Sequence, residues 1–562
     1  MTHRTISLLA LALLAAGGCA SSGSGSALLV ATTDVHGAYS TSPEGKAGLR
    51  PLAAMVDRLR AEGRAVVLVD SGDMWSGTLL SDAHEGAPGV AVYNALGVAA
   101  AALGNHEVDY GPVGASRVGD DAFGALEARM AEARYPILAA NVHARPGAKD
   151  AAGLRFDGHT VVERGGLRIG IVGVVTPVTP QIAFPYVGEA LEFEAAEPAV
   201  EREAKALREA GVDAVVVLAH IGGACATPAL DDASTCEADS ELFALVQATP
   251  PGLVDVWLGG HTHKRVLARL GGAIVAQGAA NAREAAEVTL TREAGGPLVT
   301  DARLVPIEAT PAEIAASPTA QKVDAILAPL EAEQAAVRGR ELGSTLAAPL
   351  GRDYDRGSAM GSFVCDALMA VTPGTSACFY NSGGLRADLP AGPITYGGIY
   401  DVLPFGNAIT TLDLTGAQIA EIVRIGTAGA HGSIQLGGLR VVVDRTRDAC
   451  PTVDRNHDGH IDTEDRDRVV SLTLADGSPL DPAATYRVVT NSFLASGGDS
   501  LGAVTRGLPP ERVHTELDRP DREAIAAWLT ATPQTFNTPE APITGERLRY
   551  EGEEPVSGCT AP

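Results

Sequence analysis

Short apolar runs alternate with amphipathic stretches from about residue 27 to residue 305. The runs are rich in Ala or β-branched residues and are bounded by Gly, Asp or His, which predicts buried strands. They occupy residues 27–33, 65–70, 98–103, 135–142, 167–175, 213–220, 254–260 and 272–278. Residues 48–63 and 197–211 have helical spacing with charged outer faces. This alternation predicts a layered α/β domain.

The pattern changes in the second half of the chain. Residues 311–340 are predicted to be a polar helical connector, and residues 341 to about 550 mix helices with strands such as 439–444 and 485–493. A chain of 562 residues is too long for a single core. The sequence therefore predicts two or more domains, and it contains no internal repeats.

Composition and charge narrow the class of partner. The chain is 46% hydrophobic, 20% charged and 4% aromatic, with a formal net charge of −26. Such a surface repels nucleic-acid polymers and anionic membranes. A phosphate-bearing substrate would therefore need a locally positive site, built from metal ions or clustered Arg.

The N-terminus is predicted to be an export signal. A basic head and the apolar segment "ISLLALALLAA" precede "GGCASSGSGS". The single Cys19 after small residues resembles a bacterial lipoprotein cleavage site, although Ala16 stands where Leu is commoner. We expect a signal at 1–19, lipidated Cys19 and a tether at 20–26, with ordinary signal cleavage as the alternative. No other stretch of the sequence is long and apolar enough to span a membrane.

The number of cysteines supports export. Seven Cys minus Cys19 leave six, an even number for an oxidising compartment. Six cysteines allow 15 connectivities, and proximity in sequence favours the pairs Cys225–Cys236, Cys365–Cys378 and Cys450–Cys559. Buried free thiols are the alternative. None of the cysteines has the CxxC spacing of a metal site.

Polar side chains gather at the carboxyl ends of the predicted strands, which is the edge of an α/β sheet where sites form. These residues are Asp34, His36, Asp73, Asn105, His106, His220, His261 and His263. The pairs Asp34/His36 and His261/His263 are each two residues apart. On extended backbone, the members of each pair would point the same way.

This mixture of imidazole, carboxylate and one amide, without thiolate, suits Zn, Mn, Fe or Co. There are too many ligands for one ion, so two ions bridged by one carboxylate are expected. Such a pair polarises a phosphoryl group and provides hydroxide at neutral pH. A single one of these His would be interpreted as a capped or core residue, but agreement among five strand ends favours a metal site.

The motifs "TTDVHG", "DSGDMWSGT", "GNHEVDY", "LAHIG" and "GGHTH" resemble, in order, those of the calcineurin-like metallophosphatases. The segments "YNSGGLRADLPAGPITYGGIYDVLPFGN" and "TNSFLASGGDS" resemble the C-terminal domain of 5'-nucleotidases. The resemblance implies a four-layer αββα metallophosphatase domain at 27–308, a connector helix at 309–340 and a smaller α+β nucleoside-binding domain at 341–550. A tail at 551–562 follows.

The resemblance also implies roles for individual residues. The metal ligands would be Asp34, His36 and His263 for the first ion, Asn105, His220 and His261 for the second, and Asp73 as the bridge. His106 would stabilise charge on the phosphate or leaving oxygen, and Asp109 would fix the tautomer of His106. Family members often carry Gln at the position of His263, so the metal preference can differ here.

The second domain would bind the substrate. Arg386 is expected to hold the phosphate, with Arg352 and Arg356 as companions. Phe405 and Phe493 would stack on the base. The remaining expected contacts come from Asn381 near the base, Gly383 in "NSGGLR" and Asp499 on the ribose hydroxyls. Solvated Arg and core Phe are the alternative interpretation of these residues.

Residues 454–465, "DRNHDGHIDTED", follow a calcium-loop pattern with Gly459 at position 6 and Asp at position 12. The expected ligands are Asp454, Asn456, Asp458, the carbonyl of His460, Asp462 and Asp465. A solvated acidic loop is the alternative.

These features predict an exported envelope lipoprotein, monomeric or homodimeric, that removes phosphate from nucleoside 5'-monophosphates by attack of a metal-activated hydroxide. Nucleoside diphosphates and nucleotide sugars are further candidate substrates. The alternatives are a 2',3'-cyclic-nucleotide phosphodiesterase/3'-nucleotidase, a sulfur-ester hydrolase and a non-catalytic surface protein that binds nucleotide and calcium. The complete ligand set speaks against the non-catalytic interpretation, and the intact "NSGGLR" and "LPFGN" favour the 5' enzyme.

Overall fold

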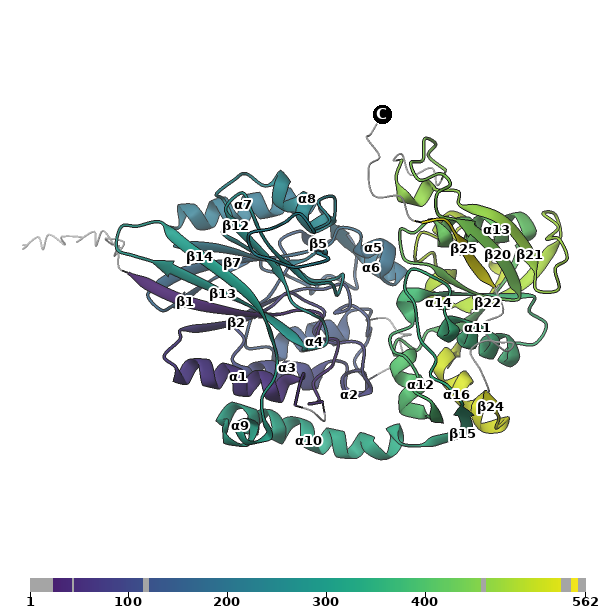
Figure 1. Ribbon diagram of the computed structural model, residues 1–562, viewed down its shortest axis with the longest axis horizontal. Coiled ribbons are helices and arrows are strands. Elements are labelled where there is room, and N and C mark those ends of the chain that lie inside the picture. The colour runs from purple at the N-terminus through teal and green to yellow at the C-terminus, as the bar shows by residue number, and fades with distance from the viewer. Residues whose placement is uncertain (1–23, 43–44, 115–120, 456–460, 537–546, 554–562) are drawn as a thin grey trace, which may run out of the picture.

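The computed structural model describes residues 24–42, 45–114, 121–455, 461–536 and 547–553. An N-terminal α/β part built on two large sheets lies at one end of the molecule, and a smaller α+β part lies at the other (Figure 1). Helix α10 runs along one edge of the N-terminal part towards the C-terminal part.

The first large sheet has six strands in the order β14-β13-β1-β2-β3-β4. Strands β1 to β4 are parallel, β13 extends the sheet antiparallel to β1, and β14 is antiparallel to β13. The bounds are β1 Gly25–Thr32, β2 Val66–Asp70, β3 Ala100–Ala102, β4 Ile137–Leu138, β13 Glu284–Arg292 and β14 Leu298–Pro306.

The second large sheet also has six strands, in the order β11-β12-β10-β9-β7-β6. Its four middle strands are parallel and its two edge strands are antiparallel. The bounds are β6 His159–Arg164, β7 Leu167–Val175, β9 Ala214–His220, β10 Val256–Leu258, β11 Val266–Leu270 and β12 Ala273–Gln277. A short ribbon, β5 Val142–Ala144 with β8 Leu191–Phe193, lies beside them.

The two sheets pack face to face. One core, which includes Leu29, Val69, Ile171 and Val216, draws buried side chains from both sheets. A second core joins the first sheet to α1, α3, α4 and α10, and a third joins the second sheet to α7 and α8. The N-terminal part is therefore a four-layer αββα sandwich, as predicted.

The helices of the N-terminal part connect strands and cover the outer faces of the sheets. Their bounds are α1 Leu49–Ala61, α2 Leu79–Asp82, α3 Ala87–Leu96, α4 Gly124–Glu132, α5 Thr179–Ile182, α6 Pro185–Ala190, α7 Ala196–Glu209 and α8 Glu241–Ala248. Both helical stretches predicted from spacing, 48–63 and 197–211, are confirmed as α1 and α7. The eight predicted strands are confirmed as β1, β2, β3, β4, β7, β9, β10 and β12.

The connector consists of two helices, α9 Pro311–Ala316 and α10 Pro318–Arg338. Ser317 separates them and caps α10, since its side chain accepts a hydrogen bond from the Ala320 amide. Helix α10 is docked on the N-terminal part, because Val323 and Leu327 are buried in that core. Arg50 of α1 also donates two hydrogen bonds to Glu331, both at 2.9 Å.

The C-terminal part has a central sheet in the order β19-β16-β22-β18-β23, flanked by two three-stranded sheets. Its strands are β15 Glu341–Leu346, β16 Ala377–Asn381, β17 Gly392–Thr395, β18 Ala408–Thr415, β19 Ile434–Gly437, β20 Leu439–Asp444, β21 Val469–Leu474, β22 Thr485–Asn491, β23 Val513–Pro520, β24 Thr535–Phe536 and β25 Leu548–Glu551. Strands β20 and β22 confirm the predicted strands 439–444 and 485–493, of which the second gives way to a helix at Ser492.

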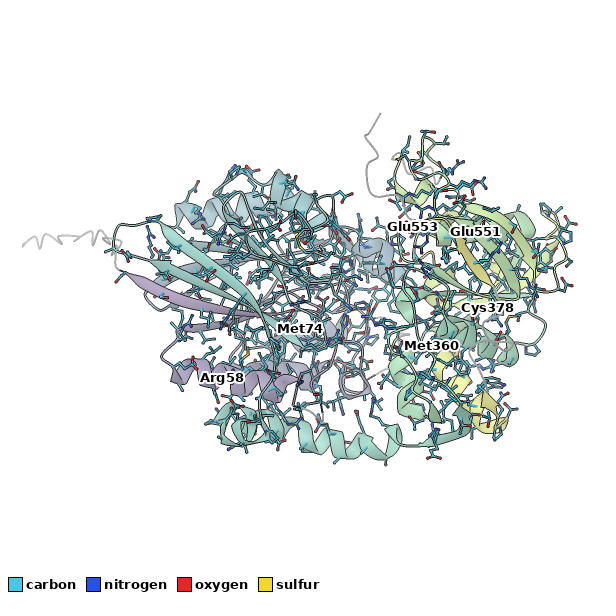
Figure 2. The ribbon with its side chains drawn as sticks, in the orientation of Figure 1. Arg58, Met74, Met360, Cys378, Glu551 and Glu553 are labelled. Carbon is cyan, nitrogen blue, oxygen red and sulfur yellow. A yellow bond between two sulfur atoms is a disulfide. The ribbon has the colours of Figure 1, made fainter. Side chains whose placement is uncertain are left out.

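Helices cover both faces of this central sheet. The α-helices are α11 Ala359–Val371, α12 Tyr396–Val402, α13 Gly416–Thr427, α14 Ser492–Ala495, α15 Gly502–Thr505 and α16 Asp521–Ala531. Short 3₁₀ turns are η1 Ser382–Gly384, η2 Thr463–Asp465 and η3 Pro510–Arg512. Met360 and Cys378 belong to the core on the α11 side, whereas Met74 belongs to the N-terminal core (Figure 2).

Two of the three predicted disulfides are confirmed, Cys225–Cys236 and Cys365–Cys378. Cys450 is also disulfide-bonded, and its predicted partner Cys559 lies outside the described residues, as does Cys19. Within the described part of the chain, no helix combines the length and apolarity needed to cross a bilayer.

Candidate metal centre and substrate cleft

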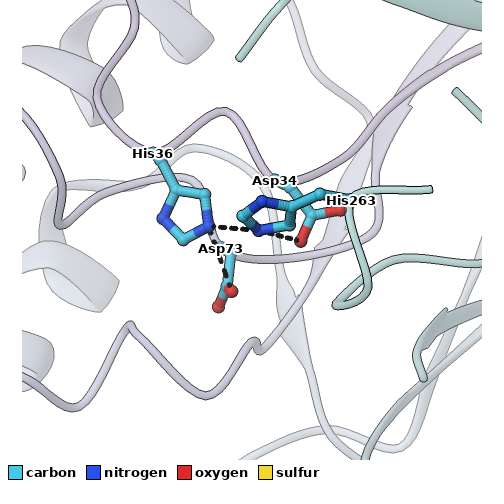
Figure 3. Close-up of side chains that lie close together, drawn as sticks. All are labelled: Asp34, His36, Asp73 and His263. Atoms are coloured by element: carbon cyan, nitrogen blue, oxygen red, sulfur yellow. Dashed lines mark hydrogen bonds and ion pairs between the residues drawn. The ribbon is translucent and has the colours of Figure 1, made fainter. Parts of the chain in front are cut away.

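Four of the predicted ligands meet in one cluster at the carboxyl ends of the strands (Figure 3). Asp34, His36, Asp73 and His263 each offer a ligand atom, and these atoms all lie within 4.8 Å of one another. The Nε2 atoms of His36 and His263 are 2.9 Å apart. His36 Nε2 lies 3.5 Å from Asp73 Oδ2, and His263 Nε2 lies 3.5 Å from Asp34 Oδ1.

The other three predicted ligands form an adjoining cluster. His220 Nε2 lies 3.1 Å from Asp73 Oδ2 and 3.0 Å from Asn105 Oδ1. His261 Nδ1 lies 2.9 Å from the same Asn105 oxygen. Asp73 Oδ2 therefore faces both clusters, which is the position that a bridging carboxylate requires.

The backbone that carries these ligands differs from the prediction. The expected extended conformation is wrong for both segments, 34–36 and 261–263. The φ angles of Asp34, His36, His261 and His263 are 51°, 49°, 73° and 57°. Asp73 has φ 58°. Left-handed backbone is costly for residues with a Cβ and concentrates at functional sites, where packing and hydrogen bonds hold it. One such bond runs from the His261 amide to Asp34 Oδ1, at 2.9 Å.

Burial and neighbouring charge set the protonation of the cluster. Burial, then Arg386, lowers the pKa of His36, and burial with His220 lowers the pKa of His261 to about 3. Burial opposes ionisation of Asp73, but His220 and the other neighbouring imidazoles hold its pKa well below the usual value. His36 and His261 are thus neutral, the form in which imidazole binds metals, and Asp73 is ionised. His220 differs, because Asp73 outweighs burial and raises its pKa to about 10, so a metal ion would have to displace a proton from this ring.

The donor set fits divalent ions. His36 and His220 direct their Nδ1 atoms to the backbone carbonyls of Ser76 and Ser71, both at 2.9 Å. This arrangement leaves their Nε2 lone pairs facing the clusters, as outer-shell partners do at metal sites. His36 and His220 are 3% and 0% exposed, so water does not compete freely for these atoms.

His106 and Asp109 lie beside the ligands. His106 Nδ1 is 2.7 Å from Asp109 Oδ2, and the Ser76 hydroxyl donates to the same oxygen at 2.7 Å. Burial lowers the pKa of His106, but Asp109 and Asp73 outweigh it and raise the pKa above its ordinary value. The backbone amide of His106 donates to Asp73 Oδ1 at 2.9 Å. The imidazole can therefore present a positive Nε2–H group next to the metal ligands.

Glu107 is a site residue that the sequence reasoning missed. Its carboxylate accepts hydrogen bonds from the amides of Gly104 (2.7 Å), Asp73 (2.9 Å) and Met74 (2.8 Å), which ties the loop after β2 to the loop after β3. A Cβ on Gly104 would lie 2.1 Å from Asp73 Oδ1, so the close approach of the two loops requires glycine. The signal was a carboxylate adjoining two candidate site residues in "GNHE".

A cleft of about 650 Å³ joins this centre to the C-terminal part. His36, His263, Arg352 and Arg386 all line it. Arg386 Nη2 lies 3.3 Å from His36 Nε2, and Arg352 donates from Nη1 to the Leu385 carbonyl at 3.2 Å. Arg356 is exposed and is absent from the described residues that line the cleft. Its charge acts on Tyr550 instead.

The two predicted stacking residues have different neighbours. The Phe405 ring stacks on His106, with 5.3 Å between centroids and 12° between planes, and it lies 5.7 Å from the Arg386 guanidinium carbon. The Phe493 ring packs on Gly498, where an added Cβ would meet it at 2.4 Å. Joint stacking of these two rings on a base stays a prediction.

The other predicted substrate residues lie close to these. Asn381 and Asp499 line the same small pocket, and burial raises the pKa of Asp499 to about 6. Asp499 has φ 49°, another left-handed position. The Gly383 carbonyl accepts a hydrogen bond from Arg386 Nη1 at 3.4 Å.

Only the ends of the predicted calcium loop are described. Asp454, Asp462 and Asp465 are present, whereas Asn456, Asp458 and His460 lie outside the described residues. Asp465 is fully buried and accepts a hydrogen bond from the Asp462 amide at 3.0 Å.

Two family models match the chain. Residues 28–265 match the calcineurin-like phosphoesterase family, and residues 341–506 match the 5'-nucleotidase C-terminal domain. The solved structure of a 5'-nucleotidase precursor from Thermus thermophilus covers 94% of this chain and 100% of its own, with a TM-score of 0.76 and 25% identity.

Two curated relatives have about the same sequence identity to this chain but are covered to different extents. The bovine (Bos taurus) 5'-nucleotidase is 26% identical over 89% of this chain and 87% of its own length. Endonuclease YhcR of Bacillus subtilis is 25% identical over 79% of this chain. The chain spans only 34% of YhcR, about a third of that longer protein.

Proposed function

Because the chain belongs to the 5'-nucleotidase family, with a calcineurin-like phosphoesterase domain followed by a 5'-nucleotidase C-terminal domain, we propose that it releases phosphate from nucleoside 5'-monophosphates. Nucleoside diphosphates and nucleotide sugars are included as further substrates. The relatives are hydrolases, and this chain is assigned to the same class of enzyme.

The observation that carries the proposal is the meeting of Arg386 and the ligand cluster in one cleft. Arg386 from the C-terminal domain comes within 3.3 Å of His36 from the N-terminal domain. A guanidinium fork recognises phosphate oxygens well. A phosphate bound there would lie against both domains, with its nucleoside directed to the domain that carries Phe493 and Asp499.

The residues of this chain would have separate roles in metal binding and in phosphate recognition. Asp34, His36, Asp73, Asn105, His220, His261 and His263 would hold two divalent ions of the Zn, Mn, Co or Fe type. When bound, the ions supply Lewis-acid polarisation of the phosphoryl group and activation of the attacking water. Arg386 orients the phosphate, and His106 donates a hydrogen bond to the oxygen on which charge develops.

Phosphate release from five compounds tests this proposal: AMP, 3'-AMP, 2',3'-cyclic AMP, ADP and UDP-glucose, each with Mn²⁺ added. We expect the highest kcat/KM with AMP. A preference for 2',3'-cyclic AMP and 3'-AMP would favour the cyclic phosphodiesterase alternative. Absence of turnover with all five compounds would contradict the proposal.

Phe493→Ala should raise KM for AMP about tenfold, because base stacking on an aromatic ring contributes ~1–3 kcal/mol. KM for p-nitrophenyl phosphate, which has no base, should stay within about twofold of the wild-type value. Phe493 is the better choice than Phe405, whose ring also packs on His106. Steady-state kinetics with both substrates measures the effect.

The matched control is Phe536→Ala. Phe536 contacts Phe363 and Trp528 in the same domain, away from the cleft. Two outcomes would mean that Phe493 acts only on the fold. One is an equal rise in KM for both substrates in Phe493→Ala. The other is a rise in KM for AMP of the same size in Phe536→Ala.

The proposal extends to calcium at residues 454–465. The alternation of oxygen ligands and the Gly459 turn support Ca²⁺ there. Added Ca²⁺ should raise the melting temperature of the metal-loaded protein, by mass action on the folded state. Asp454→Ala should abolish that rise. A rise of the same size in the variant would remove calcium from this loop.

The proposal also includes export as an envelope lipoprotein, monomeric or homodimeric, anchored through Cys19. The signal-like N-terminus, the disulfides and the similarity to a Listeria monocytogenes protein named cell wall protein Lmo0130 support export. Mass spectrometry of the mature N-terminus tests it. An unprocessed N-terminus in the cytoplasmic fraction would contradict it.

A further inference from the structure

A single carboxylate connects the two domains next to the catalytic centre. Asp82, at the end of α2, uses its two oxygens in different directions. Oδ2 accepts a hydrogen bond from the hydroxyl of Tyr400 on α12 of the C-terminal domain, at 3.1 Å. Oδ1 accepts from the hydroxyl of Tyr110 at 2.7 Å and from the amide of Gly77 at 3.0 Å, both in the N-terminal domain.

The N-terminal partners of Asp82 hold one turn, Ser76–Gly77. The Ser76 amide donates to the Tyr110 hydroxyl at 2.6 Å, and the Gly77 amide donates to Asp82 itself. Ser76 has φ 31°, a conformation that L-residues rarely adopt and that its surroundings must maintain. The turn therefore depends on these contacts for its geometry.

Ser76 in turn orients two parts of the catalytic centre. Its carbonyl accepts a hydrogen bond from His36 Nδ1 at 2.9 Å, which directs Nε2 into the metal cluster. Its hydroxyl donates to Asp109 Oδ2 at 2.7 Å, and that oxygen also bonds His106 Nδ1 at 2.7 Å. A displacement of the Ser76 turn would misalign both imidazoles, and small misplacements of this kind are costly in catalysis.

The C-terminal end of this connection is buried and packed against charged partners. Tyr400 is 2% exposed, and the Arg522 guanidinium carbon lies 4.2 Å from its ring centroid. Its neighbour Asp401 is paired with Arg338 at the end of α10, at 2.6 and 3.0 Å. These contacts set the direction in which the Tyr400 hydroxyl faces Asp82.

Building on the proposed function, we propose that Tyr400 is a positioning residue for the reaction. Through Asp82 it holds the Ser76–Gly77 turn in the geometry that aligns His36 and the His106–Asp109 pair. Docking of the C-terminal domain would then complete the catalytic centre of the N-terminal domain, in addition to supplying Arg386 and the nucleoside site.

Tyr400→Phe should lower kcat by roughly 3- to 10-fold with AMP and with p-nitrophenyl phosphate alike, the size expected from one lost hydrogen bond. KM for either substrate should change less than twofold, because the hydroxyl does not touch the substrate. The assays use the full chain with saturating Mn²⁺. Release of bound metal to a chelator should be faster in this variant, because His36 is held less firmly.

The matched control is Tyr396→Phe on the same helix. The Tyr396 hydroxyl bonds Glu523 within the C-terminal domain at 2.5 Å, so its loss should leave kcat and metal release unchanged. An unchanged kcat in Tyr400→Phe, an equal loss in Tyr396→Phe, or an effect confined to KM for AMP would overturn the proposal.

Asp82→Asn gives a second route that does not depend on the stability of Tyr400→Phe. This variant should lower kcat on its own, and adding Tyr400→Phe should cause no further loss, because both changes break one connection. Fully additive losses would overturn the proposal. Turnover of p-nitrophenyl phosphate without turnover of AMP by the wild type would contradict the proposed function, yet the Tyr400 comparison could still be read.

Discussion

Asp73→Asn is expected to purify with fewer divalent ions at both metal positions and to lose at least about 100-fold in kcat. Asp73 Oδ2 is 3.1 Å from His220 Nε2 and 3.5 Å from His36 Nε2, so one oxygen serves both clusters. An amide either offers a weaker, neutral oxygen or turns its NH₂ towards the imidazoles. Either outcome lowers the affinity of the site for both ions, because a bridging ligand stabilises the bound pair.

The same substitution removes the charge that organises the site. Asp73 raises the pKa of His220 to about 10 against the effect of burial, and it accepts the His106 amide through Oδ1 at 2.9 Å. Asn can still accept that amide, so the loop should keep its shape while the metals are lost. Elemental analysis and kcat measured on one preparation, with the melting temperature of the metal-free proteins, test this expectation.

Asp70→Asn is the matched control for Asp73→Asn. Asp70 is also fully buried at the end of β2, but its oxygens are used by Thr32, Tyr93 and the Gly72 amide. Burial raises the pKa of Asp70 to about 7, so a neutral amide is a close substitute there. Asp70→Asn should keep both ions. Two tightly held ions per chain with normal turnover in Asp73→Asn would remove Asp73 from the bridge.

The buried parallel strands could be predicted because their sequences are almost wholly apolar. β9, for example, is buried at every position. The antiparallel strands β6, β11, β13 and β14 were not predicted. β14 alternates half-buried and exposed residues and includes Asp301 and Arg303, which is a weak signal in a single sequence. The place of β14 is set by its pairing with β13, which is a tertiary effect.

Some site residues could likewise be predicted from the sequence and others could not. The clustering of the candidate ligands could be predicted because each lies at the end of an apolar strand, and strand ends converge at one edge of a sheet. Glu107, Ser76 and Asp82 could not be predicted, because their partners are distant in the sequence. Glu107 accepts from the Asp73 amide, and the Ser76 carbonyl accepts from His36 Nδ1. Asp82 accepts from the Tyr400 hydroxyl of the other domain. The left-handed backbone of the ligands was equally hidden, since hydrogen bonds between loops maintain it.

His106 differs from the ligands around it in ways that point to a role in the reaction itself. Its side chain is 18% exposed, whereas His36 and His220 are 3% and 0% exposed. Its Nδ1 is occupied by Asp109, and its ring stacks on Phe405 at the cleft. Asn105, the preceding residue, makes the contacts to His220 and His261 instead. The structure therefore allows the metals to be retained when the His106 side chain is removed.

His106→Ala is accordingly expected to bind both ions and to lose ~10²–10⁴ in kcat with AMP, the range for a positioned acid/base or charge-stabilising group. Asp109→Asn should lose less, because it removes only the orienting partner. His159→Ala is the matched control, since His159 forms the same kind of pair with Glu203, also at 2.7 Å, but on the β6 edge. If His106 were only a strand cap, the variant would melt earlier yet keep its turnover per folded molecule. Full activity with two ions bound would contradict the catalytic role, because a group that stabilises charge in the transition state cannot be removed without slowing the chemical step.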